Sequence, residues 1–294
     1  MASVYDIPVP EIIEFTGASG NRLVADRRGA LSARPVLLAH GGGQTRHAWR
    51  GTADRLADRG WCAITIDQRG HGESDWIEDG AYEFEHYAED IAVVADEIAV
   101  LTGRRPVAIG ASLGGFAAML AQGGTERRLF EALVLVDITP TVDMSGVEKI
   151  LGFMAAHVEQ GFGSLDEAAD AIAAYLPHRR RPRDLAGLTK NLTLCDDGRY
   201  RWHWDPRFLH GRYPIAEHHV AYRERNVAAA KALSLPVLLV RGGQSELVSE
   251  EHARAFMEFV PHADYADVSG AGHMVAGDRN DVFTDAVIAF LGKL

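Results

Sequence analysis

The chain has 294 residues, with 30 Lys or Arg against 41 Asp or Glu, so its formal net charge is −11. This acidic balance argues against a nucleic-acid-binding protein, and a hydrophobic content of 47% argues against a disordered one. Two cysteines, Cys62 and Cys195, are too few for a disulfide scaffold or a zinc site built on CxxC pairs. No apolar run reaches the ~18 residues of a membrane span, and no signal peptide is recognisable, which predicts a cytoplasmic protein.

Short apolar runs recur along the chain, and each ends at Gly or at a polar residue. Runs such as VLLAH, AIGAS, LVLVD and VLLVR are typical of strands that are buried on both faces. The predicted strands are Glu11–Phe15, Val36–His40, Cys62–Asp67, Val107–Gly110, Ala132–Asp137, Val237–Arg241 and Tyr265–Val268. The predicted helices are Trp49–Arg59, Ala88–Leu101, Ser112–Ala121, Glu250–Val260 and Asp281–Leu291. This alternation predicts an α/β fold with a mostly parallel sheet and helices on both faces.

Residues 140–226 interrupt the alternation, because they show helical periodicity and no convincing buried strand. Ser164, followed three residues later by Glu167, is typical of the start of a helix. We therefore expect a core made of residues 1–139 and 227–294. Residues 140–226 would then form a helical cap, or lid, inserted over the strand ends.

The segment Gly110-Ala-Ser112-Leu-Gly114-Gly115 follows a predicted strand and opens a predicted helix. This is the context of a nucleophile elbow, in which a serine occupies a tight strand-to-helix turn. Flanking glycines leave room for the turn, and the start of the helix favours negative charge. The pattern therefore predicts Ser112 as the nucleophile and the N–H of Leu113 as one donor of an oxyanion hole.

A second glycine-rich segment, His40-Gly41-Gly42-Gly43, follows the predicted strand VLLA. Such a run allows backbone N–H groups to approach a substrate oxygen closely, so Gly42, with Gly43 as the next choice, is the predicted second oxyanion donor. Neither glycine cluster matches GxGxxG or is followed by GK[ST], which argues against nucleotide binding.

A serine nucleophile needs a base, and the base needs an acid to orient it. Among 13 histidines, His273 lies in a loop of small residues between the last predicted strand and the last predicted helix. Glu246 lies in the loop after the predicted strand Val237–Arg241. The chain order Ser112, Glu246, His273 agrees with the order of such triads in alpha/beta hydrolases.

These motifs together resemble the alpha/beta-hydrolase fold superfamily, and the resemblance covers nearly the whole chain. The matching segments are HGGGQTRHAW, DQRGHGESDW, GASLGG, RGGQSELV and GAGHM. The resemblance implies about eight strands, a cap inserted after the sixth, and a pocket between cap and core. It also implies a loop beside the site formed by Asp67, Arg69, Gly70, His71, Gly72 and Ser74.

The resemblance leaves the acid open, because the acid in this superfamily is more often Asp than Glu. Some members place it after the strand that corresponds to LVLV here, which makes Asp137 the alternative to Glu246. Aromatic and apolar side chains of the inserted region, and one beside the glycine-rich loop, are candidates for the lining of a substrate pocket, with packing of the lid as the alternative. These are Trp49, Phe153, Met154, Trp202 and Trp204.

A serine nucleophile indicates acyl transfer, since an alkyl-enzyme ester would need a carboxylate at the elbow. We expect hydrolysis of a small-molecule carboxylic ester, lactone or thioester, without a cofactor or a metal ion. C–C bond hydrolysis or peracid formation on the same triad is an alternative. A ligand-binding protein with slow or no turnover is an alternative from another class. The sequence leaves open whether the chain forms a homodimer.

Overall fold

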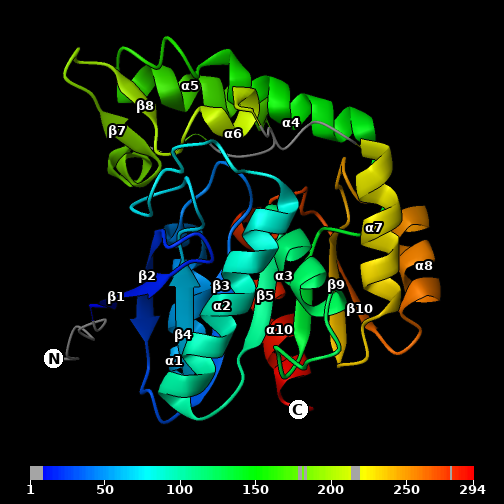
Figure 1. Cartoon of the computed structure of the whole chain (residues 1–294). Helices are drawn as coiled ribbons and strands as arrows, with labels where there is room; N and C mark the ends of the chain where they lie inside the picture. Colours follow the sequence, from blue (N-terminus) through cyan, green and yellow to red (C-terminus); the bar gives the residue numbers. More distant parts are fainter. Residues whose placement is uncertain (1–8, 178–180, 182–183, 213–218, 279) are drawn as a thin grey trace, which may run out of the picture.

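The fold is built on one eight-stranded sheet in the computed structural model, which describes residues 9–177, 181, 184–212, 219–278 and 280–294 (Figure 1). Its strands are β1 (Glu11–Thr16), β2 (Arg22–Arg28), β3 (Arg34–Ala39), β4 (Trp61–Ile66), β5 (Val107–Ala111), β6 (Leu133–Val136), β9 (Val237–Gly242) and β10 (Asp264–Val268). Their order in space is β1-β2-β4-β3-β5-β6-β9-β10. Strand β2 is antiparallel to both of its neighbours, and the other pairs are parallel. The predicted mostly parallel sheet is therefore confirmed.

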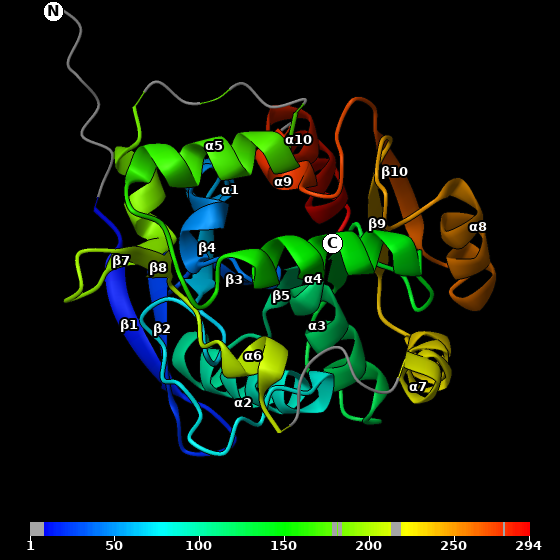
Figure 2. The same ribbon diagram turned by 90° about the horizontal axis from the view of Figure 1, so that it is seen from above.

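Helices cover both faces of this sheet (Figures 1 and 2). One face is covered by α1 (Arg50–Ala57) and α10 (Asn280–Leu291), next to the short helices η1 (Arg46–Trp49) and α9 (Val275–Asp278). The other is covered by α2 (Phe84–Thr102), α3 (Leu113–Gly123), α7 (His219–Lys231) and α8 (Glu250–Phe259). No helix in the described ranges is long and apolar enough to cross a membrane.

The central strands are apolar throughout because both of their faces are buried. In β3, Val36 and Leu38 pack with α1 and α10, whereas Leu37 and Ala39 pack with α2 and α3. This alternation follows from the two-residue repeat of a strand. A continuous apolar run is thus divided between two hydrophobic cores, one on each side of the sheet.

Strand β2 was not predicted, because its sequence RLVADRR is interrupted by charges. Two of these charged residues, Asp26 and Arg28, are buried but paired: Arg46 Nε lies 2.8 Å from Asp26 Oδ1, and Arg28 Nε lies 2.5 Å from Asp54 Oδ1. Burying a charge is costly unless a partner compensates it. The compensating partners come from η1 and α1, so the local sequence of β2 does not reveal that it is buried.

The segment between β6 and β9 contains α4 (Met144–Ala156), α5 (Leu165–Tyr175), η2 (Ala186–Lys190), β7 (Leu192–Leu194), β8 (Tyr200–Trp202), α6 (Arg207–His210) and α7. Helices α4, α5 and α6 lie across the upper edge of the sheet in Figure 1. Strands β7 and β8 form a short antiparallel hairpin that we did not predict. The expected boundary between residues 226 and 227 falls inside α7, which packs closely on α3: a Cβ at Gly123 would lie 2.3 Å from the Ala229 carbonyl oxygen. We call residues 140–218 the inserted segment.

Candidate active site

Ser112 occupies a strained turn directly after β5. Its backbone has φ 46° and ψ −113°, a conformation that non-glycine residues rarely adopt. A Cβ at Gly110 would lie 2.4 Å from the Gly114 carbonyl oxygen, and a Cβ at Gly114 would lie 2.5 Å from the Ala39 carbonyl oxygen. Only glycine fits at these two positions, so the tightness of the turn explains why glycine stands two residues before and two residues after Ser112. Ser112 is thereby held at the N-terminus of α3, where negative charge is favoured.

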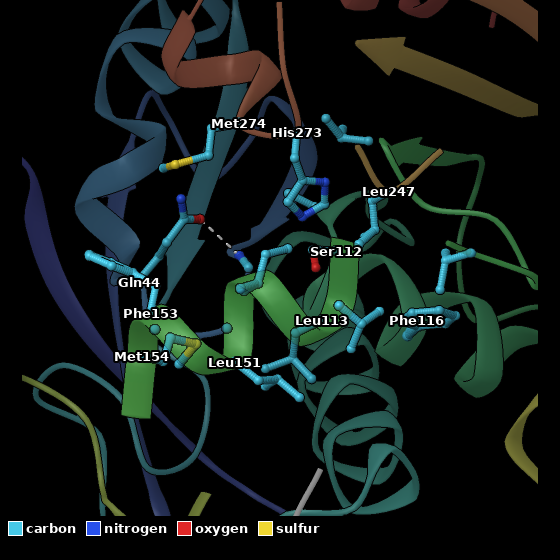
Figure 3. Close-up of a pocket in the computed structure, with 18 of the residues that line it drawn as sticks. Gln44, Ser112, Leu113, Phe116, Leu151, Phe153, Met154, Leu247, His273 and Met274 are labelled. Carbon is cyan, nitrogen blue, oxygen red and sulfur yellow. Dashed lines mark hydrogen bonds between the residues drawn. The ribbon is translucent and has the colours of Figure 1, made fainter. Parts of the chain in front are cut away.

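Asp137 holds the imidazole of His273. The Nδ1–H of His273 donates to Asp137 Oδ2 over 2.7 Å, which leaves Nε2 free to act as a base. Asp137 follows β6 directly, and because Ala111 and Val136 pair in the sheet, Asp137 and Ser112 occupy equivalent positions at neighbouring strand ends. Figure 3 shows the ring of His273 and the side chain of Ser112 facing one another.

The carboxylate of Asp137 is fully buried and well supplied with hydrogen bonds. Its Oδ1 accepts from the Gly242 N–H over 2.8 Å, and its Oδ2 accepts from the Ser245 hydroxyl over 2.6 Å as well as from His273. The backbone of Asp137 is strained like that of Ser112, with φ 51°. The surrounding contacts thus fix the direction of this carboxylate.

Within the described residues, Glu246, our first choice for the acid, has no hydrogen bond or ion pair with His273, which is bound by Asp137 instead. Its carboxylate lies 3.5 Å from the Lys149 ammonium on α4. Burial, and secondarily the charge of Glu246, raise the pKa of Tyr175 on α5 to about 12. The loop after β9 turns Glu246 outward because Ser245, one residue earlier, points inward to Asp137 and accepts from the N–H groups of Leu247 and Val248. Glu246 therefore links the core to the inserted segment.

The loop after β3 makes a tight turn beside Ser112. The Gln44 N–H donates to the Gly41 carbonyl oxygen over 3.2 Å, and Gly43 has φ 74°, as the third residue of a type II turn requires. In the described part of the chain, the N–H groups of Gly42 and Leu113 have no acceptor. The N–H of Gly43, our second choice as an oxyanion donor, donates to His71 Nε2 over 3.1 Å.

Two buried histidines support this loop as neutral rings. Burial lowers the pKa of His40 to about 4, and burial together with the neighbouring His40 lowers the pKa of His71 to about 3. His71 donates from Nδ1 to the Arg69 carbonyl oxygen, so both of its ring nitrogens are occupied. His71 is also absent from the described lining of the cavity, and its Nε2 contacts the loop.

A cavity of about 950 Å³ lies between the carboxyl edge of the sheet and the inserted segment. Figure 3 shows Gln44 and Met274 on one side of Ser112, and Phe116 and Leu247 on the other. All five predicted pocket residues line the cavity, namely Trp49, Phe153, Met154, Trp202 and Trp204. Among the described lining residues, only Arg223 and Glu251 carry a fixed charge, and both are exposed.

Two residues near the site were not predicted at all. The Ser245 hydroxyl donates to Asp137, and Gln44 Oε1 accepts from the N–H of Gly41. No sequence signal identifies either, because their partners are a residue more than one hundred positions away and a backbone N–H. Across the described residues, no group of three His, Cys, Asp or Glu side chains is placed to hold a metal ion.

A model of the alpha/beta hydrolase fold family matches residues 34–279. The chain is 30% identical over 283 residues to the esterase Rv0045c of Mycobacterium tuberculosis, which covers 92% of this chain and 86% of that protein. It is 28% identical over 272 residues, 92% of each protein, to the 2-(acetamidomethylene)succinate hydrolase of Mesorhizobium japonicum. A solved structure of the M. tuberculosis esterase aligns with 97% of this chain and 93% of its own, with a TM-score of 0.74 and 28% identity. With its elbow, its sheet and its relatives in agreement, the chain belongs to the alpha/beta-hydrolase fold family and is a hydrolase.

Proposed function

We propose that this hydrolase cleaves uncharged, largely apolar carboxylic esters through an acyl-enzyme on Ser112. His273 Nε2 takes the Ser112 proton as Oγ attacks the ester carbonyl, and Asp137 orients the imidazole and stabilises its charged form. The N–H groups of Gly42 and Leu113 stabilise the oxyanion. His273 gives the proton to the leaving alkoxide, which departs as the alcohol. Water then attacks the acyl-enzyme while His273 takes a proton from it, the bond to Ser112 Oγ breaks, and His273 returns that proton to Oγ as the carboxylic acid leaves.

The observation that carries this proposal is the character of the cavity into which Ser112 faces. Its volume of about 950 Å³ is near the upper limit of small-molecule sites, so it has room for both the acyl and the alcohol part of an ester. Its described walls carry no fixed charge apart from the exposed Arg223 and Glu251. Burying an unpaired carboxylate against such walls would be costly.

The scarcity of fixed charges in the cavity favours neutral esters over the charged substrates of other hydrolases. The Mesorhizobium relative is named for a succinate, which carries two carboxylates, and the dienoate substrates of C–C bond hydrolases are also anions. An anionic substrate calls for basic side chains beside the nucleophile, and Arg223 is the one fixed cation among the described lining residues. The M. tuberculosis esterase is therefore a better guide to the substrate class of this chain than the Mesorhizobium hydrolase is.

The test compares two activated esters of equal chain length, p-nitrophenyl hexanoate and the mono-p-nitrophenyl ester of adipic acid. We expect kcat/KM to be at least tenfold higher for the neutral ester, and turnover of both to be lost in Ser112→Ala. A preference for the adipate ester would contradict the substrate class but leave the serine mechanism. Full turnover in Ser112→Ala would contradict the mechanism itself. Tight ester binding without turnover in the wild type would instead indicate a ligand-binding protein.

A further inference from the structure

We propose that Gln44 is a positioning residue that aims the oxyanion hole. It does so by occupying the N–H of Gly41 and thereby orienting the N–H of Gly42 toward the cavity. This inference rests on the proposed esterase mechanism, and it adds a residue outside the triad and the two oxyanion donors. It is carried by the hydrogen bonds of the loop 41–44, which follows β3.

Three of the four N–H groups in this loop are already engaged. The Gly41 N–H donates to Gln44 Oε1 over 3.0 Å, drawn as a dashed line in Figure 3. The Gly43 N–H donates to His71 Nε2 over 3.1 Å, and the Gln44 N–H closes the turn on the Gly41 carbonyl oxygen. Within the described ranges, Gly42 alone in this loop has an N–H without an acceptor. The loop thus presents one unpaired N–H donor. The side chains of Gln44 and His71, which accept from Gly41 and Gly43, determine that this donor is Gly42.

The composition of the loop explains why a side-chain acceptor is needed. Three consecutive glycines have more conformational freedom than any other tripeptide, so their N–H groups are not oriented by backbone preference. Side chains are poorly placed to restrict them, because a Cβ at Gly43, where φ is 74°, would lie 2.9 Å from Met154 Cε, and a Cβ at Gly41 would lie 3.2 Å from Gln44 Oε1. Gln44 carries the first side chain after the glycines, and its amide oxygen folds back onto the first of them.

His71 restrains the other half of the turn, and its protonation state suits that role. Its Nε2 can accept from Gly43 only when the ring is neutral, and burial keeps the pKa of His71 far below its ordinary value. Gln44 needs no such tuning, because an amide oxygen accepts at any pH. Gln44 Oε1 therefore holds the peptide plane before Gly41, and His71 holds the plane after Gly42. The turn hydrogen bond from the Gln44 N–H to the Gly41 carbonyl oxygen holds the plane between them, which carries the Gly42 N–H.

The role predicts a particular kinetic signature. Gln44 touches the loop and not the developing charge, so its loss should displace the Gly42 N–H without removing it. Loss of an oxyanion donor typically costs 10²–10³-fold in kcat, and we expect a smaller loss of about tenfold from misalignment. Binding of the uncharged ester should be little affected, because the oxyanion does not yet exist in that complex.

The test uses Gln44→Met, which keeps the length of the side chain and removes the acceptor. Gln122→Met is the matched control, because the Oε1 of Gln122 also accepts a backbone N–H, that of Leu129 over 2.9 Å, at the far end of α3. We measure kcat and KM with p-nitrophenyl hexanoate. We also measure the affinity for 1,1,1-trifluoro-2-decanone, which forms an oxyanion on the serine, and for 2-decanone, which does not.

In Gln44→Met we expect kcat to fall about tenfold, KM to change less than twofold, and the affinity for the trifluoroketone to fall by the same factor as kcat. The affinity for 2-decanone should not change, and Gln122→Met should alter thermal stability alone. Wild-type kcat and trifluoroketone affinity in folded Gln44→Met would overturn the inference, as would a loss confined to KM. Gln44→Leu gives the same test if Gln44→Met does not fold. Failure of the esterase mechanism is recognised separately, by retained turnover in Ser112→Ala.

Discussion

Replacing Asp137 with Asn should abolish most of the activity while leaving the shape of the site intact. The carboxylate accepts three hydrogen bonds, one on Oδ1 from Gly242 and two on Oδ2 from Ser245 and His273. An amide has one acceptor oxygen, so if that oxygen stays with Gly242, an NH₂ group faces His273 Nδ1. The imidazole must then carry its proton on Nε2, where it can no longer accept one from Ser112.

The size of the effect follows from that change of tautomer. The same replacement in a serine protease triad lowers kcat by about 10⁴-fold, and we expect a loss of about 10³–10⁴-fold here. This corresponds to roughly 4–5.5 kcal/mol of activation free energy. The assay is the hydrolysis of p-nitrophenyl hexanoate, together with the rate at which a fluorophosphonate labels Ser112.

Glu246→Gln is the matched control, because Glu246 is the other candidate acid and because the substitution likewise replaces a carboxylate with an amide. Its ion pair with Lys149 spans 3.5 Å, and the Lys149 side chain is 56% exposed. Such a pair contributes at most about 1 kcal/mol to the free energy of unfolding. We therefore expect kcat within twofold of wild type and a small decrease in melting temperature. A loss above 100-fold in Glu246→Gln, with Asp137→Asn within tenfold of wild type, would refute the assignment of the acid.

Two further predictions concern stability. Ser112→Gly should be inactive yet more stable than Ser112→Ala in urea unfolding. The reason is that glycine adopts φ 46° without the ~1–3 kcal/mol of strain that a Cβ entails at this position. A lower free energy of unfolding for the Gly variant would contradict this. Stability should also decrease as pH falls from about 6.5 toward 4, because the buried His40 and His71 have pKa values of about 4 and 3 and only the unfolded chain binds protons in that window. The stability of His71→Gln should depend less steeply on pH than that of the wild type, and equal slopes in urea titrations at pH 7.0, 5.5 and 4.5 would count against the burial argument.

Much of the fold is readable from the sequence, because its central strands are apolar on both faces. Strands such as β3 and β6 consist almost entirely of buried side chains, so their runs stand out without any alignment. Strand β2 escapes this approach, because Asp26 and Arg28 are buried with partners from other elements. Sequence patterns detect a buried strand by its hydrophobicity and miss one whose charges are compensated at a distance.

The site shows the same division between local and distant information. The tight turn at Ser112 requires glycine two residues before and two residues after the serine, so a six-residue motif is enough to locate the elbow. Whether Glu246 or Asp137 binds His273 depends on two facts. One is that the end of β6 lies beside the end of β5, and the other is that the Ser245 side chain donates to Asp137. Those facts come from strand order and from one side-chain hydrogen bond, neither of which is encoded in spacing along the chain.

The elbow contains residues on which selection for stability acts in different ways. The strained backbone at Ser112 favours its replacement, whereas the tight packing at Gly110 and Gly114 favours keeping both glycines. A library selected only for resistance to heat should accumulate substitutions at position 112, where a smaller residue releases strain and the lost activity goes unnoticed. The same library should keep both glycines, because any side chain there would collide with the backbone of a neighbouring segment. Selection for turnover alone retains all three residues. Comparing the two selected populations would therefore separate, residue by residue, what the elbow contributes to folding from what it contributes to chemistry.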